Sequence, residues 1–146
     1  MAEPAAAQRM TTTPPPAGSP PQPQGLVRQI VVAVAAWAVP GSGHLLLRKP
    51  RRAAVVCGVV LFSFLFGCWL RGHLYVVIPE QPLSRLATLS SMGAGAPYFL
   101  ARYVVEYQGD ILSSTFEYGK AFLLTAGLLN LLAVLDAWDI ASGSKD

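Results

Sequence analysis

The chain has 146 residues, a formal net charge of +3 and only 13% charged residues, whereas 53% of its residues are hydrophobic. Soluble domains carry about a quarter charged residues, so this composition excludes an ordinary soluble protein and fits a bilayer as the solvent. The length allows one domain. The basic residues between positions 48 and 52 form too narrow a patch for nucleic-acid binding.

Residues 1–24 contain seven of the twelve prolines, separated mainly by small and polar residues. Such a segment cannot bury enough apolar surface to offset the entropy lost on ordering it, so a disordered tail is predicted. Residues 143–146 form a short C-terminal tail. Residues 25–142 between the tails are predicted to form an all-α domain, a small transmembrane bundle of about four hydrophobic segments.

The first hydrophobic segment, residues 26–47, is long enough to cross a bilayer but is broken at Pro40, Gly41, Ser42 and Gly43. Proline removes a backbone hydrogen bond, and hydrocarbon offers no substitute partner. The broken turn should therefore face protein. Two alternatives are open: a kinked span, and a half-helix that turns back.

The second segment, residues 53–70, is the clearest predicted span because it contains no charged residue. Arg52 precedes it and Trp69 marks its other end. Ser63 and Gly67 are small residues four positions apart, a spacing that lets another helix approach closely.

The third segment, residues 86–105, contains a second flexible turn that ends at Pro97. We expect a span kinked at this proline, and a helix lying on the membrane surface is the alternative. The fourth segment, residues 119–140, is apolar at its centre. Asn130 within it is predicted to hydrogen-bond a neighbouring helix.

The basic loop carries candidate contacts to lipid headgroups: Arg48, Lys49, Arg51 and Arg52. Basic loops are cytoplasmic as a rule. Both termini then lie outside if all four segments cross. The C-terminus becomes cytoplasmic if residues 86–105 lie on the surface, and the N-terminus does if the first segment turns back.

His44 follows the broken turn, and three interpretations are open. It could donate to the carbonyls freed around Pro40, contact a lipid headgroup, or act as a ligand or proton carrier. Asp136 and Asp139 share one helix face near the end of the last segment. Ionisable groups at membrane depth are candidate functional residues. The two aspartates could form a metal or proton site, pair with Arg or Lys of a neighbouring helix end, or simply reach water.

Two stretches resemble known sequences. Residues 39–49 resemble the Pro-Gly-x-Gly-His/Gln-x-Tyr-x-Gly-Arg turn of small bacterial membrane proteins, with Leu46 at the tyrosine position. Residues 122–143, which contain Leu-Asn-Leu-Leu and Leu-Asp-Ala-Trp-Asp-Ile, resemble the C-terminal helix of an uncharacterised bacterial membrane family. The resemblance implies a multi-pass protein of the bacterial inner membrane and no particular activity.

No phosphate loop, metalloprotease motif or nucleophile elbow occurs, so neither a cofactor nor a metal is predicted. We expect a non-catalytic accessory or assembly subunit, whose helices pack against a membrane-protein partner or a second copy. The alternative is a protein that binds an ion or an anionic lipid through His44, the basic loop, Asp136 and Asp139.

Overall fold

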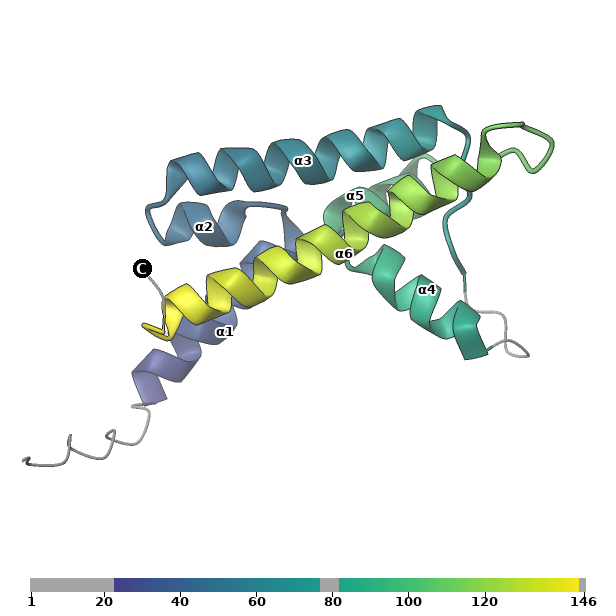
Figure 1. Cartoon of the computed structure of the whole chain (residues 1–146). Coiled ribbons are helices and arrows are strands. Elements are labelled where there is room, and N and C mark those ends of the chain that lie inside the picture. Colours follow the sequence, from purple (N-terminus) through teal and green to yellow (C-terminus); the bar gives the residue numbers. More distant parts are fainter. Residues whose placement is uncertain (1–22, 77–81, 145–146) are drawn as a thin grey trace, which may run out of the picture.

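A computed structural model describes residues 23–76 and 82–144, and every element in these ranges is helical (Figure 1). The all-α prediction is confirmed for the described residues. Residues 1–22 of the predicted disordered tail lie outside the described residues. The last two residues of that tail, 23 and 24, belong to a helix that begins at Pro23. The elements are α1 (Pro23–Ala38), α2 (Ser42–Leu46), α3 (Pro50–Trp69), α4 (Pro82–Met92), α5 (Ala96–Phe99), the π-helical turn η1 (Leu100–Val104) and α6 (Phe116–Ala141).

Two long helices, α3 and α6, lie side by side and run in opposite directions (Figure 1). Small residues face the contact: a Cβ atom on Gly67 would stand 2.9 Å from the carbonyl oxygen of Gly119. Among the described helices, only these two are long and apolar enough to cross a membrane. The expectation of about four such segments was too high.

Residues 26–47 form a helical hairpin, which is the geometry of the turning-back alternative for the first segment. Proline at position 40 stops α1 at Ala38, and Gly41 adopts φ +85°, a conformation that favours glycine. The chain then returns as α2, which packs against α1. A Cβ atom on Gly43 would lie 3.2 Å from the carbonyl oxygen of Val32.

Residues 82–104 form a second hairpin, whereas a span kinked at Pro97 was expected. The chain reverses between α4 and α5, where Gly95 has φ +71°. After the reversal, the Tyr98 hydroxyl donates to the carbonyl of Tyr75 at 3.0 Å. Tyr75 precedes α4, so both arms of the hairpin reach the same end of the molecule.

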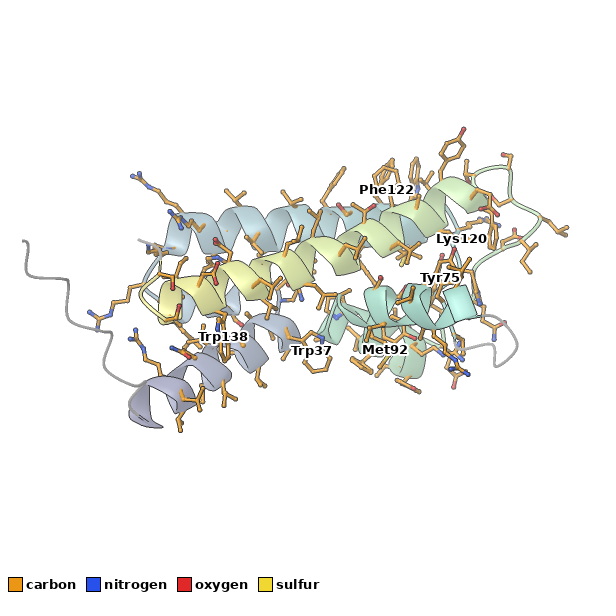
Figure 2. All side chains as sticks on the ribbon, turned by 60° about the horizontal axis from the view of Figure 1, so that its bottom comes forward. Trp37, Tyr75, Met92, Lys120, Phe122 and Trp138 are labelled. Carbon is orange, nitrogen blue, oxygen red and sulfur yellow. The ribbon has the colours of Figure 1, made fainter. Side chains whose placement is uncertain are left out.

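The two hairpins come from opposite ends of the long pair, and their tips meet beside the middle of α6 (Figures 1 and 2). The Trp37 indole nitrogen donates to the carbonyl of Met92 at 3.2 Å, and the Trp37 and Phe99 rings form an edge-to-face pair. The described chain therefore consists of two units that point in opposite directions. Each unit is a hairpin followed by a long helix.

Candidate functional site

Both hairpin tips are buried, and their backbone carbonyls are satisfied by side chains. The Ser42 hydroxyl donates to the carbonyl of Ala35 at 2.5 Å, although this carbonyl also accepts the N–H of Val39 and is not one that Pro40 frees. The Asn130 amide, which is fully buried, donates to the carbonyls of Trp37 at 3.2 Å and Gly93 at 2.8 Å. The prediction that the broken turns need protein neighbours is confirmed, and Asn130 supplies contacts to both of them.

His44 is 1% exposed, and its Nε2 atom lies 3.0 Å from Oδ2 of Asp136. The interpretation of His44 as a donor to freed carbonyls is therefore wrong: its Nε2 atom faces Asp136, and the Asn130 amide donates to the tip carbonyls. The Nδ1 atom of His44 is buried without a hydrogen-bond partner in the described part of the chain. The imidazole thus has one nitrogen held by a carboxylate and one nitrogen enclosed by the protein.

A cavity of about 310 Å³ lies where α2, the start of α3 and the last turns of α6 come together, and both partners of this pair line it. Pro50 begins α3 because its fixed φ and missing N–H suit the first helical position. That start places two arginines in the first turn of α3. The lining consists of His44, Arg51, Arg52, Val55, Val56 and Asp136.

The other predicted contacts lie around this cavity without lining it. Lys49 lines a neighbouring hollow of about 380 Å³, together with Arg51 and Arg52. Asp139 lies one turn beyond Asp136 on α6, and Arg48 follows α2 with φ +58°. The paired-carboxylate interpretation gains no support, since the described residues contain no group of three His, Cys, Asp or Glu side chains that could hold a metal ion.

The charges around the cavity suit a phosphate-bearing ligand. Two arginines and one aspartate line it, and Arg forms paired hydrogen bonds to phosphate oxygens. The first turn of α3 adds the positive end of a helix dipole. Asp136 orients the imidazole of His44 and keeps the net positive charge small.

The small-residue pair Ser63 and Gly67 packs within the chain. Ser63 is 7% exposed, and a Cβ atom on Gly67 would stand 2.8 Å from Cγ of Leu123 on α6. This face of α3 is therefore occupied by α6 and is not open to a partner protein.

Sequence reasoning missed the opposite end of the molecule and the contact between the hairpins. At that end, the Lys120 ammonium lies 5.6 Å from the centre of the Tyr75 ring (Figure 2), and Arg71 pairs with Asp110 at 3.1 Å. Burial lowers the pKa of His73 there, assisted by the nearby charges of Arg102 and Lys120. A lone histidine in a polar connector gave no signal of this environment.

Comparison with known proteins gives one result. A family model described as a family of unknown function (DUF6677) matches residues 31–146. That range includes all of α2 to α6 and the second half of α1. Neither curated proteins nor solved structures gave a match. Because the match covers well over half of its length, the chain belongs to the DUF6677 family of unknown function.

Proposed function

We propose that this chain is a multi-pass membrane protein in which α3 and α6 cross the bilayer. The 20 residues of α3 extend about 30 Å, which equals the thickness of a typical hydrocarbon core. Within the most apolar 18 residues of each helix, only 28% of α3 and 33% of α6 are buried inside the protein. Hydrocarbon outside the protein is the solvent that such surfaces need.

In this proposal, the two hairpins enter the membrane from opposite sides and return without crossing. Their tips meet near the midplane, where Asn130 and the neighbouring helices replace the missing backbone partners. Irregular backbone at membrane depth is tolerated where protein surrounds it. The basic loop, the start of α1 and the end of α6 then share one side, which is cytoplasmic by the positive-inside rule. The resemblance to bacterial families favours the bacterial inner membrane.

The function that the geometry supports best is binding of a phosphate-bearing lipid headgroup at the cytoplasmic interface. The observation that carries it is the cavity in which Arg51, Arg52 and His44 converge. In the proposed placement, this cavity lies at headgroup depth, beside the first turn of α3. A basic pocket at this depth is a recurrent way to hold anionic lipids.

The cavity supports binding more than catalysis. Its lining contains no Ser, Thr, Cys, Tyr or Lys, and its two groups that could act as nucleophiles, His44 and Asp136, are paired with each other. The Asp136–His44 pair alone could move a proton, and this is the second candidate function, based on the unpartnered Nδ1 atom. Action through a membrane-protein partner or a second copy stays a prediction.

The test compares two lipids that differ only in the phosphate. The full chain in mild detergent is titrated with phosphatidic acid or with diacylglycerol of the same acyl chains, and binding is measured by native mass spectrometry. Each Arg near a membrane surface contributes roughly 1 kcal/mol to anionic-lipid binding. The Arg51→Gln/Arg52→Gln variant should therefore bind phosphatidic acid about 30-fold more weakly.

Arg48→Gln is the matched control, because it removes a charge from the same loop without touching the cavity. It should bind within about threefold of the parent chain, since a charge outside the cavity acts mainly at long range. Equal binding of both lipids, or equal weakening by both variants, would contradict the proposal. Competition by inorganic phosphate separates a site for free phosphate from one for a lipid headgroup.

A further inference from the structure

A second cavity, an apolar groove of about 470 Å³, runs along the flank of α3 that faces away from the basic cavity. Cys57, Leu61 and Leu65 follow one stripe of α3 along it. The second hairpin forms the opposite wall through Pro97 and Leu100. The groove thus separates the second hairpin from α3 over part of their length.

The chemistry of the groove excludes a polar ligand. No charged side chain lines it, and its single hydroxyl, on Tyr107, is already used, because it donates to the carbonyl of Cys68 at 2.9 Å. A ligand group inside the groove would therefore find no available hydroxyl or charge, and burying a polar group without a partner costs about 1–3 kcal/mol. The occupant must be a hydrocarbon at this depth.

The groove is too small to enclose a helix from a partner protein. Between Cys57 and Cys68, α3 extends about 16 Å, and a helix with side chains about 10 Å wide would fill about 1,300 Å³ over that length. The groove offers only about 470 Å³. A single unbranched hydrocarbon chain is narrow enough to fit.

The length of the groove matches one leaflet of a bilayer. It begins at the hairpin tips, beside Pro40 and Pro97, and ends beside Cys68 and Tyr107 near the last turn of α3. Half of a hydrocarbon core is about 15 Å thick. An acyl chain that enters from the interface at Tyr107 would therefore reach the hairpin tips.

We propose that this groove binds one acyl chain of a lipid from the leaflet opposite the basic loop. This inference rests on the proposed membrane placement of α3 but not on the headgroup site, which lies on the other flank of the helix. The chain fills the space between α3 and the second hairpin. It thereby completes the packing that the short second hairpin leaves open.

Photocrosslinking in a bilayer tests the proposal. The full chain is placed in nanodiscs of phosphatidylcholine with a diazirine near the end of one acyl chain, irradiated, and mapped by peptide mass spectrometry. Labelling at Cys57, Leu61 and Pro97 should exceed that at Val59 and Phe62 by at least about fivefold, because a bound chain holds its diazirine at the inner end of the groove while bulk chains spread theirs over many depths. Val59 and Phe62 are exposed on α3 at the same depth, outside the groove.

A groove-filling variant provides the second measurement. Ala96→Phe, at an exposed position on the wall, should lower labelling of the groove at least about fivefold, whereas Val59→Phe should leave it unchanged. Equal labelling on all faces of α3, or no loss in Ala96→Phe, would overturn the acyl-chain site while leaving the membrane placement intact. Absence of label from every face would overturn the placement and this inference together, whatever the result for phosphatidic acid.

Discussion

Asn130 is the residue on which the contact between the two hairpins depends most. Its amide donates to carbonyls of two segments that lie 93 and 37 positions away in the sequence. Both carbonyls belong to chain reversals, where no helical N–H remains to satisfy them. One buried side chain therefore performs a role that the backbone performs in an unbroken span.

Asn130→Leu should lower the free energy of unfolding by about 1–3 kcal/mol, because it leaves buried carbonyls without donors. Thermal unfolding of the full chain in mild detergent measures the effect. Thr125→Val is the control: Thr125 is exposed on the same helix, and its hydroxyl donates only to the carbonyl of Ala121 within that helix. Equal destabilisation by the two variants would show that the hairpin contact contributes nothing measurable.

His73 gives the protein a predictable dependence on pH. Its pKa in the folded chain is lowered from 6.5, first by burial and then by Arg102 and Lys120, so folding favours the neutral imidazole. The unfolded chain therefore binds more protons as the pH falls through 6.5. The stability that His73 contributes is fully present above pH 6.5 and is lost progressively below it.

The unfolding midpoint of the parent chain should therefore fall between pH 7.5 and pH 5, and His73→Asn should reduce that fall. The difference between the two proteins in the slope of unfolding midpoint against pH isolates His73, because His44 is present in both. Identical slopes for the two proteins would mean that the environment of His73 has no effect on folding.

At the scale of elements, Gly95 permits the second hairpin to meet the first. It has φ +71° and ψ −137°, a combination almost confined to glycine. A Cβ atom at this position would collide with the carbonyl oxygen of Trp37. The tip of the second hairpin can therefore approach the end of α1 only because residue 95 has no side chain.

Gly95→Ala should destabilise the chain by about 2 kcal/mol or more, through strain and loss of the contact at Trp37. Gly58→Ala is a control of the opposite sign, because Gly58 lies within α3 and a Cβ atom there would meet nothing within 4 Å. Better helix propensity should make that variant slightly more stable, by about 0.5–1 kcal/mol. Chemical or thermal unfolding in detergent would rank the two, and a neutral Gly95→Ala would refute the close approach.

The long helices could be predicted from the sequence, whereas the hairpins could not. Hydrophobic runs and flanking charges are local signals, so residues 53–70 and 119–140 correspond closely to α3 and α6. Pro40 and Pro97 also marked breaks correctly. Whether a broken segment crosses or returns depends on what satisfies its freed carbonyls, and the answer lies in Asn130, far away in sequence.

In the candidate site, too, local sequence signals mark the residues but do not predict which of them come into contact. With all four segments crossing, the basic loop is cytoplasmic and Asp136 lies near the outer end of the last segment, so only the surface alternative for residues 86–105 brings the two together. The pairing of His44 with Asp136 spans 92 positions, and no local pattern predicts a contact of that kind. The apolar groove also left no signal, because its wall residues are ordinary apolar residues of three separate segments.

At the scale of the whole molecule, the two units place distinct chemistry at opposite ends. One end carries the basic loop and the His44–Asp136 pair, and the other carries ion pairs such as Arg71–Asp110. The hairpins and the Asn130 contact join these ends through the middle. An inverted pair of units with broken helices at the centre is an arrangement known from membrane transport proteins, although two spans are few for enclosing a path.

The proposed topology makes a prediction that separates two crossings from four. With Cys57 and Cys68 replaced by Ala, single cysteines at Gly25 and Arg48 should react with an impermeant maleimide from the same, cytoplasmic side. Cysteines at Leu83 and Leu112, both highly exposed, should react only from the opposite side. Labelling of right-side-out and inside-out vesicles measures this directly.

If Gly25 and Arg48 react from opposite sides, the first hairpin crosses the membrane. Pro40 and Gly41 would then not be buried at the tip of a returning hairpin, and the proposed topology would be wrong. If Leu83 and Leu112 react from opposite sides, the same conclusion holds for the second hairpin, whose chain reversal at Gly95 could not then persist in the bilayer.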